Sequence, residues 1–497
     1  MAAHLAPLYT IDQIRAIEIA ANKADPDARL MERAGAAAAM TAVAMLGTRG
    51  KNVLVLAGPG NNGGDAFEVA LNLKRGFYHP YVVFIDDTAR LPADAANALK
   101  KWRGAGGEVH PEIPTQKVWH LVVDGLFGIG LARPVATQHG ALIAAANGLG
   151  VPILALDIAS GVNGDTGAVQ GTAIRAAQTI TFIACKPGLL TLDGPDHCGV
   201  LECDSLGLDV ESLVPAEGRI VDHAILGDAP GPRRQNFHKG DAGSLAIVGG
   251  AVGMTGAALL AGRAALKSGA GKVFLALLAD PAPQVDPLYP EMMIRRAEQL
   301  LATGKLDALV AGPGMGTDAL AQRVLAHVLR ADVPIVLDAD ALNLVGGYST
   351  LANALVTRAA PTLITPHPAE AARMLGSTVA EVQSNRVATA RLLARRFKVN
   401  ALLKGNGSVL ATPDGHWSIV RAGNPGMATG GMGDVLCGVI GALLAQGTPA
   451  SQALPLGVYL HAAAADRCVE EGIGPIGLTA GDVIDRVRAL INHRPKR

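Results

Sequence analysis

Residues 53 to 67 read VLVLAGPGNNGGDAF, an apolar strand that runs into a glycine-rich loop and then into a helical pattern. Glycines 58, 60 and 63 have the spacing of a dinucleotide-binding loop, in which backbone N–H groups and a helix N-terminus meet a pyrophosphate. Asp65 would place a carboxylate where that phosphate lies, unless it only caps the helix. Asn61 and Asn62 add side-chain oxygens, so the loop suits a hydroxylated or ring ligand, or a cation, better than bare phosphate.

The same alternation of strands and helices extends outward from this loop. The sequence predicts strands at 52–58, 81–86, 120–124, 152–157 and 178–184, preceded by helices at 11–22 and 28–46. This order is typical of βαβ units, in which helices cover a parallel sheet. We therefore expect an α/β fold here, a Rossmann-like three-layer domain.

A Gly-, Pro- and charge-rich stretch at 227–243 interrupts the pattern, and a second alternation follows it. Strands are expected at 244–249, 272–278, 307–311, 334–338, 361–365 and 400–403, before a long helical region. No fixed-period repeat links the halves. The sequence predicts two different α/β domains, residues 1–223 and residues 224–497.

Composition limits the functions open to this chain. Of 497 residues, 49% are hydrophobic and 17% charged, which predicts a packed globular protein. Lys+Arg and Asp+Glu both number 43, so no global electrostatic field attracts nucleic acid or an anionic membrane.

Five cysteines without a CxxC pair predict neither disulfides nor a zinc site. The start lacks a signal-peptide pattern, and the apolar run at 435–445 is too short for a membrane span. We expect a buried helix there and a cytoplasmic protein.

Polar residues follow several predicted strands of the first half. Because the carboxyl ends of parallel strands share one edge, Asn62, Asp124, Asp157 and Ser160 are expected to converge. Oxygen ligands of this kind suit a hard cation, and Lys186 supplies a positive group after a later strand. Each acid also has an ordinary role as a cap or turn former. A dehydrogenase stays possible at this point, because Asp86 ends the second strand about where a ribose-binding acid would lie.

Four motifs now make a family resemblance specific. LMERAG (30–35), GPGNNGGD (58–65), DGLFGIGLARP (124–134) and DIASGVNGDTG (157–167) resemble NAD(P)H-hydrate epimerases over nearly the whole first half. That family interconverts the two C6 epimers of hydrated NAD(P)H. The resemblance implies that the substrate is held by Asn61, Asn62, Gly63, Gly64, Asp65, Gly128, Ile129, Gly130, Leu131, Ala132, Arg133, Pro134 and Asp157.

The resemblance also implies roles for individual side chains. Asn62, Asp124 and Ser160 would hold a potassium ion, and Asp157 would lie beside the nicotinamide ring. Epimerisation must open the C–O bond and close it from the other face, so Asp157 is the candidate acid/base and Lys186 its electrostatic partner. This chain has Ala66 and Ala159 where the family usually has Gly and Pro. Both replacements are small, so we expect altered loop stiffness with the chemistry kept.

The second half contains another glycine loop, GNPGMATGGMGDVLCGVI at 423–440. Six glycines precede or enter an apolar helix, with Asp434 on its first turn. Exposed N–H groups at a helix start form an anion hole for a transferring phosphoryl group, and Asp434 could accept the proton of an attacking hydroxyl. The alternative is a glycine-rich turn with an acidic cap.

This loop resembles the anion hole of ribokinase-like folds. With HKGDAGSLAIVGG (238–250), MTGAALLAGRAALKSGAG (254–271), AGPGMG (311–316), LDADALN (337–343), TPHPAE (365–370) and KGNGSV (404–409), the half is similar to NAD(P)H-hydrate dehydratases of the ADP-using type. The resemblance implies dehydration of the S hydrate with magnesium and ADP, giving NAD(P)H, AMP and phosphate. By resemblance, Ala257, Gly316, His367 and Asp434 contact the hydrate, and Lys404, Gly405, Asn406, Gly407, Ser408 and Gly433 contact the adenine nucleotide.

Three rival interpretations differ in class. Ribokinase-like folds also include small-alcohol kinases, which would leave a stable phosphorylated product. The first half could be a binding module without catalysis. A dehydrogenase is the third rival, although nothing in the chain names an alcohol or carbonyl substrate. Small-molecule substrates are the expected partners, and ribokinase-like dehydratases often form homotetramers.

Overall fold

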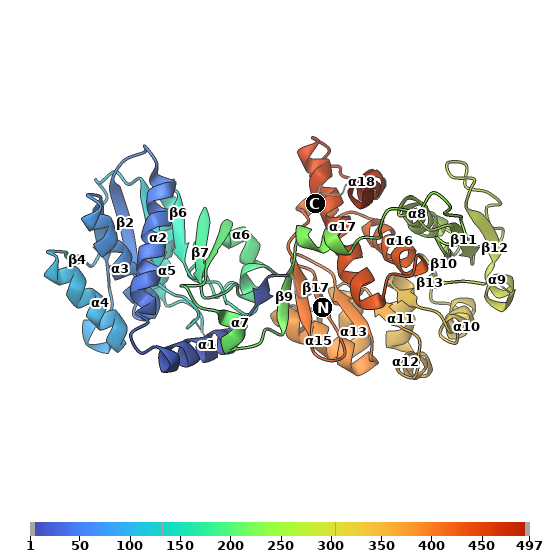
Figure 1. Ribbon diagram of the computed structural model, residues 1–497, viewed down its shortest axis with the longest axis horizontal. Helices are drawn as coiled ribbons and strands as arrows, with labels where there is room; N and C mark the ends of the chain where they lie inside the picture. Colours follow the sequence, from blue (N-terminus) through green and yellow to red (C-terminus); the bar gives the residue numbers. More distant parts are fainter. Residues whose placement is uncertain (1–4, 132, 304, 493–497) are drawn as a thin grey trace. The chain divides into compact units, whose positions relative to one another are not determined.

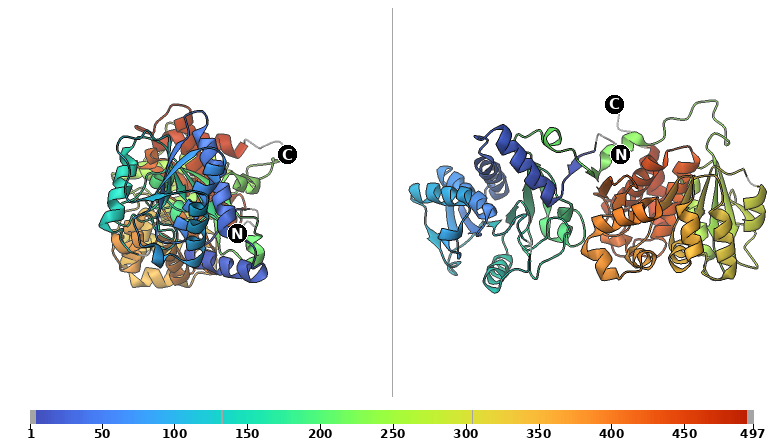
Figure 2. Two further views of the ribbon diagram at one scale, coloured as in Figure 1. Left: turned by 90° about the vertical axis from the view of Figure 1, so that its left-hand side faces the viewer. Right: turned by 90° about the horizontal axis from the view of Figure 1, so that it is seen from below.

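The computed structural model describes residues 5–131, 133–303 and 305–492. The chain folds into two compact units (Figure 1). One runs from Pro7 to Glu217, and the other begins at Gly218 and also includes Leu5 and Ala6. Each unit has its own main sheet, and Figure 2 shows the chain from two further directions.

The N-terminal unit is built on a parallel sheet with the strand order β4-β3-β2-β5-β6-β7-β8. The strands are β2 (Asn52–Ala57), β3 (His79–Val83), β4 (Val109–His110), β5 (Leu121–Gly125), β6 (Ile153–Leu156), β7 (Gln178–Phe182) and β8 (Val200–Asp204). Apolar runs such as NVLVLA bury nearly every residue of the central strands, as expected when both faces are covered.

Helices connect these strands. They are α1 (Ile11–Ala24), α2 (Leu30–Leu46), α3 (Asn61–Arg75), α4 (Ala93–Gly104), α5 (Thr137–Gly148), α6 (Gly194–Cys198) and α7 (Val210–Leu213), with short 3₁₀ turns η1 (Thr88–Arg90) and η2 (Pro187–Leu189). From β2 the chain moves to β3 and β4, whereas from β5 it moves the opposite way to β6. Because such crossovers are right-handed, α3 and α5 lie on opposite faces of the sheet. The reversal between β2 and β5 is where ligand crevices form in Rossmann-like folds.

The sheet of the C-terminal unit continues from β9 in the order β9-β18-β17-β16-β15-β14-β13-β10-β11-β12. Its strands are β9 (Gly218–Val221), β10 (Ser244–Gly249), β11 (Lys272–Leu277), β12 (Met293–Arg296), β13 (Ala308–Ala311), β14 (Ile335–Leu337), β15 (Thr362–Ile364), β16 (Asn400–Leu403), β17 (Val409–Ala411) and β18 (Trp417–Val420). The pairings from β16 to β12 are parallel, and β17 pairs antiparallel with both its neighbours.

The predicted strands of both halves are found close to their expected positions, but the domain limit differs. Residues 218–223 were assigned to the first domain, yet β9 pairs in parallel with β18 of the second. The backbone N–H of Ile220 also donates to the carbonyl of Ala6 at 2.8 Å. A four-residue strand carries no sign in its sequence of which sheet it will join, so the hydrogen bonds decide its place.

The remaining helices pack around the second sheet. They are α8 (Thr255–Lys267), α9 (Ala297–Thr303), α10 (Ala319–Val328), α11 (Ala339–Gly347), α12 (Ser349–Val356), α13 (Pro368–Leu375), α14 (Val379–Ser384), α15 (Arg386–Phe397), α16 (Met432–Ala445), α17 (Ala450–Glu470) and α18 (Ala480–Asn492), with 3₁₀ turns η3 (His223–Asp228) and η4 (Pro425–Met427). No helix of the described residues is both long and apolar enough to cross a membrane.

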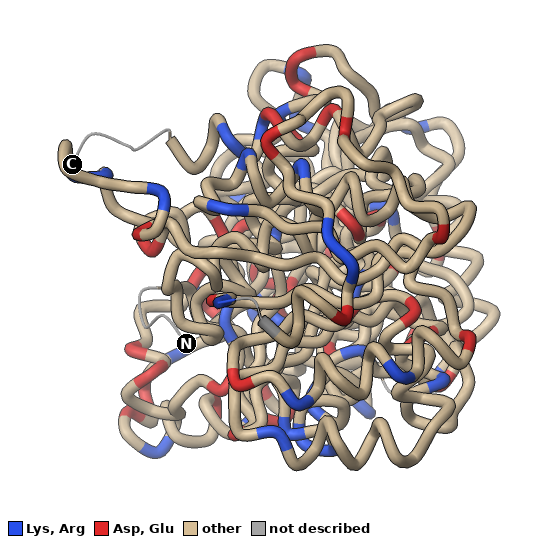
Figure 3. The backbone as a smooth tube through the Cα atoms, turned by 90° about the vertical axis from the view of Figure 1, so that its right-hand side faces the viewer, with Lys and Arg blue, Asp and Glu red and all other residues tan. Residues whose placement is uncertain are grey.

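The charged residues are not segregated by sign. Figure 3 shows acidic and basic residues interspersed along the chain.

Helix α16 lies at the centre of the second core, as the apolar run predicted. Every residue from Val435 to Ala445 is buried. Gly438 contacts the backbone of α8 so closely that a Cβ there would collide with the carbonyl of Ala261, and a Cβ at Gly441 would lie 2.6 Å from a methyl of Val310. These two glycines fix the height and rotation of the helix.

We therefore expect Gly438→Ala to lower the free energy of unfolding of the C-terminal unit by about 1–3 kcal/mol, because overpacking forces the two helices apart. Gly256→Ala is the matched control, since a Cβ at Gly256 on α8 has no neighbour within 4 Å. Urea titrations of both variants check this. An equal loss in the two variants, or no loss at Gly438, would contradict the packing argument.

Candidate functional site

The first candidate site is a cavity of about 940 Å³ at the carboxyl ends of β2, β5 and β6. It lies at the reversal of strand order, as the sheet topology requires. Among the predicted residues, those that line it are Asn61, Asn62, Asp65, Gly128, Ile129, Gly130, Leu131, Arg133, Asp157 and Lys186. Gly63, Gly64, Pro134, Asp124 and Ser160 are not on its surface, and Ala132 lies outside the described residues.

The glycine loop is shaped by close backbone contacts. A Cβ at Gly58 would collide with the carbonyl of Leu126, and one at Gly63 with the carbonyl of Gly58. Helix α3 begins at Asn61, with Gly60 as its N-cap. The interpretation of Asp65 as a cap is therefore wrong, because Asp65 is the fifth residue of the helix and faces the cavity instead.

Two of the three predicted potassium ligands are in direct contact. Both carboxylate oxygens of the fully buried Asp124 accept from Ser160, Oδ1 from the hydroxyl at 2.6 Å and Oδ2 from the backbone N–H at 2.8 Å. Burial raises the pKa of Asp124 to about 6, although these hydrogen bonds oppose the rise. Asn62 is 7% exposed and packs against Gly125, next to Asp124. Neither its amide oxygen nor its amide nitrogen has a partner among the described residues.

The candidate acid/base is held by a buried ion pair. Oδ1 of Asp157 accepts from the ammonium of Lys186, which is 1% exposed, and also from Thr181 and the N–H of Phe182. The Lys186 ammonium uses its other protons on the Thr181 hydroxyl and the Phe182 carbonyl, both at 2.8 Å. Asp157 has a left-handed φ of 65°, which is uncommon outside glycine and characteristic of functional sites. Its Oδ2 faces Gly128, where a Cβ would approach to 3.1 Å.

Further charged residues of this cavity were not predicted. Glu18 from α1 lines it, and burial together with the charge of Asp157 raises the pKa of Glu18. Lys101 from α4 donates to Glu32 and Glu68, each at 2.7 Å, and all three line the cavity. Glu32 belongs to the LMERAG motif, which could have revealed it. Glu18 lies in a helix of mixed polar and apolar residues and gave no signal.

The second candidate site is at the start of α16. The helix begins at Met432, its N-cap Gly431 has a φ of 89°, and no side chain among the described residues caps it. Its first N–H groups are thus available to an anion, as the sequence predicted. Gly433 brings this helix start against two charged groups, since a Cβ there would lie 3.1 Å from Oδ2 of Asp338 and 3.3 Å from Nζ of Lys404.

Asp434 is on the first turn of this helix. Burial, together with the negative charges of Asp338 and Asp340, raises the pKa of Asp434 to about 6, and Lys404 opposes the rise. Lys404 donates to Oδ1 of Asp338 at 2.6 Å and lies 3.9 Å from Glu370. Burial alone would lower the pKa of Lys404, but these two carboxylates outweigh it and raise that pKa.

Two of the predicted hydrate contacts, Gly316 and His367, each contact an acid of this site. The N–H of Gly316, which has a φ of 74°, donates to Asp340 at 2.8 Å, and Ala257 packs against the preceding turn at Gly314. His367 caps α13, because its Nδ1 accepts from the N–H of Ala369 at 3.1 Å. Its Nε2 lies 3.1 Å from Glu370, so the ring is held by its own turn and is half-exposed.

Arg386 holds the start of the predicted nucleotide loop, Lys404 to Ser408, through hydrogen bonds. This guanidinium is 1% exposed and donates to the carbonyls of Leu403 and Lys404, each at 3.2 Å. Burial lowers the pKa of Arg386 to about 10. Gly405, with a φ of 140°, leaves room for it, since a Cβ would lie 2.9 Å from Nη2.

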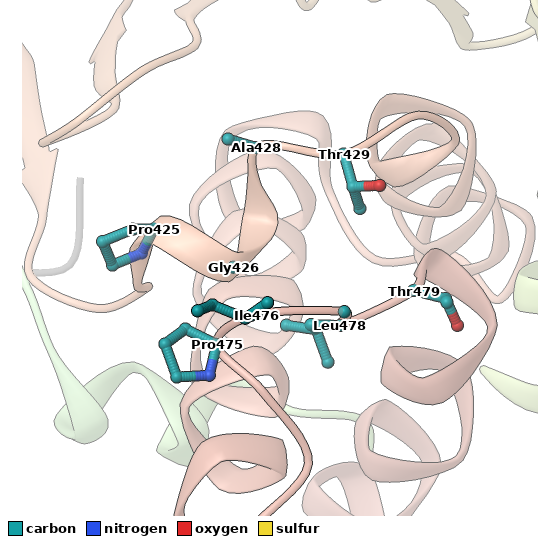
Figure 4. Close-up of a pocket in the computed structure, with 9 residues that line it drawn as sticks. Pro425, Gly426, Ala428, Thr429, Pro475, Ile476, Leu478 and Thr479 are labelled. Carbon is teal, nitrogen blue, oxygen red and sulfur yellow. The ribbon is translucent and has the colours of Figure 1, made fainter.

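A smaller pocket of about 450 Å³ lies between the glycine loop and the loop before α18 (Figure 4). It is lined by Pro425, Gly426, Ala428, Thr429, Pro475, Ile476, Gly477, Leu478 and Thr479. At the start of the glycine loop, Asp466 of α17 accepts from the N–H of Gly423 at 2.8 Å and from the amide of Asn424 at 2.9 Å. The loop that leads to Gly433 and Asp434 on α16 is thereby held at its start.

Sequence reasoning missed Asp338, Asp340, Glu370 and Arg386. Asp338 and Asp340 stand in the motif LDADALN and Glu370 in TPHPAE, so both motifs contained the signal. Arg386 starts the charged helix RVATARLLARRF and was indistinguishable from an exposed arginine.

Models of two known families match this chain in succession. The model described as YjeF-related protein N-terminus matches residues 27–188, and the model described as NAD(P)H-hydrate dehydratase matches residues 245–487. The two matches fall in the two structural units, one in each.

Curated relatives resemble the chain over most of its length. It is 40% identical to the bifunctional NAD(P)H-hydrate repair enzyme Nnr of Escherichia coli (strain K12), over 88% of this chain and 85% of that protein. It is 38% identical to the enzyme of that name from Coxiella burnetii, over 98% of this chain and 99% of the relative. Among solved structures, the ADP/ATP-dependent NAD(P)H-hydrate dehydratase from Bacillus subtilis is 31% identical, covers 54% of this chain and 94% of its own, and has a TM-score of 0.47.

Proposed function

The chain belongs to the family of bifunctional NAD(P)H-hydrate repair enzymes, and we propose that its two activities are divided between the two units. The N-terminal unit interconverts the R and S forms of hydrated NADH and NADPH at C6. The C-terminal unit dehydrates the S form to NAD(P)H, using ADP and releasing AMP and phosphate. Because hydration produces both epimers, the first activity supplies the second.

The observation that carries the dehydratase assignment is Asp434 beside an uncapped helix start, with Lys404 within reach of the same point. Asp434 takes the proton of the C6 hydroxyl as its oxygen attacks the β-phosphorus of ADP, and the bond to AMP breaks. The N–H groups of Gly433 and its neighbours and the Lys404 ammonium stabilise the charge that develops on the phosphoryl oxygens. Magnesium bound with the nucleotide would supply further positive charge to the phosphates.

Phosphorylation converts the C6 hydroxyl, a poor leaving group, into a phosphate ester, which leaves readily. The lone pair of the ring nitrogen then expels phosphate from C6, and loss of a proton from C5 restores the double bond of NAD(P)H. The products are NAD(P)H, AMP and phosphate, so atoms balance and no oxidation state changes. We assign the hydrate contacts to Ala257, Gly316, His367 and Asp434. We assign the nucleotide contacts to Lys404, Gly405, Asn406, Gly407, Ser408 and Gly433.

In the N-terminal unit, Asp157 transfers the proton as the C6–O bond opens and closes. The Lys186 ammonium and two further donors stabilise its carboxylate through Oδ1, which leaves Oδ2 toward Gly128 and the cavity. We assign the substrate contacts to the loops that begin at Asn61 and Gly128. A cavity of about 940 Å³ is large enough for a dinucleotide's nicotinamide half and its neighbouring groups.

Potassium is the cation we propose for this unit. The residues present fit it. The buried amide of Asn62 has no partner among the described residues, Asn62 packs against Gly125 next to Asp124, and all three side chains offer a hard oxygen. Asn62, Asp124 and Ser160 would hold the ion. Its positive charge would stabilise phosphate oxygens of the substrate near the helix start.

A stability measurement tests this cation. Because a ligand that binds only the folded state stabilises it, potassium is expected to raise the Tm of the parent chain above its value in tetramethylammonium of equal ionic strength. Asn62→Ala should lose that increment. Asn97→Ala, at another wall of the cavity, should keep it. An increment that survives in Asn62→Ala would place potassium elsewhere.

The activity itself is tested with a mixture of both epimers, ADP, magnesium and the full chain. Recovery of the near-ultraviolet absorbance that NAD(P)H has and its hydrates lack is expected to be complete, since epimerisation feeds the R form into dehydration. Recovery that stops at the S fraction would refute the epimerase. A stable phosphorylated product without AMP and NAD(P)H would instead indicate a small-alcohol kinase.

A further inference from the structure

The cavity of the N-terminal unit contains an acid that the mechanism above leaves without a role. Asp65 points into it from α3, and among the described residues it forms no hydrogen bond or ion pair. A carboxyl that lies on a cavity wall without any partner is costly to bury as an anion. Its neighbours make that cost larger, as the charges around it show.

The charged groups acting on Asp65 are mostly negative. Burial is the largest influence and raises its pKa well above the usual range, and the carboxylates of Asp157, Glu18 and Glu68 raise it further. Only the Lys186 ammonium opposes them. The nearby Lys101 is already bound to Glu32 and Glu68, so its charge is shared within that cluster. These influences together favour the protonated form of Asp65 over its carboxylate.

Asp157 differs from Asp65 because several hydrogen-bond donors contact its carboxylate. The ammonium of Lys186 and the donors at Thr181 and Phe182 all meet its Oδ1, which stabilises the ionised carboxylate. The cavity thus contains one carboxyl without a hydrogen-bond partner among the described residues and one whose Oδ1 is met by three donors. Unequal surroundings of this kind assign acid and base roles to carboxyl pairs in other enzymes. Strand β5 lies between β2 and β6, so the two carboxyls enter the cavity from either side of the loop that follows β5.

Epimerisation at C6 needs a proton donor on one face and an acceptor on the other, and the direction must be reversible. We propose that Asp65 is the second proton-transferring residue of the epimerase, acting on the face of C6 opposite to Asp157. This inference rests on the epimerase activity proposed above. It gives Asp65 a catalytic role in addition to contact with the substrate.

Each step balances. Asp65 protonates the C6 hydroxyl while the lone pair of the ring nitrogen forms a C=N bond, and the C6–O bond breaks to release water. Water then adds to the other face and gives a proton to Asp157, while the C=N electrons return to nitrogen. The site ends with Asp157 protonated and Asp65 ionised, which is the state that processes the opposite epimer. Exchange of a proton with solvent restores the first state.

The test is the rate of R-to-S exchange in the full chain without ADP, so that dehydration is silent. Asp65→Asn is expected to slow exchange by about 100-fold or more, the usual size of general acid catalysis, with a larger effect on kcat than on KM. Asp65→Glu should recover part of the rate. Asp12→Asn, exposed on α1 and outside the cavity, is the control that should match the parent.

A second measurement separates catalysis from a purely structural role. Glu18→Gln removes one negative neighbour of Asp65, so the alkaline limit of the exchange rate should move to lower pH in this variant. Exchange in Asp65→Asn at the parental rate, or an unmoved alkaline limit in Glu18→Gln, would overturn the inference. If the parent itself exchanges no faster than buffer, the proposed epimerase fails, which is a different result.

Discussion

Asp434→Asn is expected to slow ADP-dependent formation of NAD(P)H from the S epimer by about 100-fold to 10,000-fold, the range lost when a general base is removed. Asparagine keeps the shape of the side chain but does not accept the hydroxyl proton. It also removes a negative charge next to Asp338 and Asp340, so folding is not impaired by the change. Initial rates with purified S epimer, ADP and magnesium measure the loss.

The pH dependence of the parent gives an independent check on the same residue. Asp434 must be ionised to act as a base, and its pKa is raised to about 6. The rate of dehydration should therefore fall as pH decreases through about 6 and be level above it. Asp485→Asn, on the exposed side of α18, should retain both the rate and the pH profile. Normal dehydration by Asp434→Asn would remove Asp434 from the mechanism.

Asp157→Asn is the second change with a large expected effect, on the other activity. Exchange between the epimers should fall by about 100-fold or more, because the amide neither accepts nor returns the proton. Recovery of NAD(P)H from a mixed substrate should then stop at the S fraction, apart from slow spontaneous exchange. The C-terminal unit should still dehydrate purified S epimer at the parental rate.

This substitution also leaves the Lys186 ammonium buried without its counter-ion. Breaking a buried ion pair costs about 3–5 kcal/mol, so the unfolding of the variant has to be measured beside its activity. Asp86→Asn is the matched control, because Asp86 also follows a strand of this sheet but pairs with His139 at 2.9 Å and does not line the cavity. An equal loss of epimer exchange in the two variants would show that Asp157 is not the proton-transferring residue.

The strands of both units could be predicted because their apolar runs are bounded by glycine, proline and acids. The position of Asp434 on the first turn of α16 could be predicted because six glycines and an apolar run define where that helix starts. Local pattern was sufficient in each of these cases. It was also sufficient to bring Asp124 and Ser160 to one edge of the sheet.

Other parts depend on contacts that local pattern does not encode. Lys186 follows Asp157 by 29 positions, so their ion pair exists only once β6 and β7 are paired. Arg386 begins a helix rich in charged residues, yet it is buried because the carbonyls of Leu403 and Lys404 receive its protons. For Asp65 the choice between a helix cap and a ligand contact stayed open, because the sequence does not show that α3 starts at Asn61.

The hydrogen bond from Ile220 to Ala6 makes the N-terminal unit an insertion within the other unit's chain. The insertion consists of residues 7–217. The residues that flank it belong to the same unit and lie close together. A fragment cut to start at Gly218 would lose the backbone of Leu5 and Ala6 and uncover groups on β9, an open edge that invites self-association.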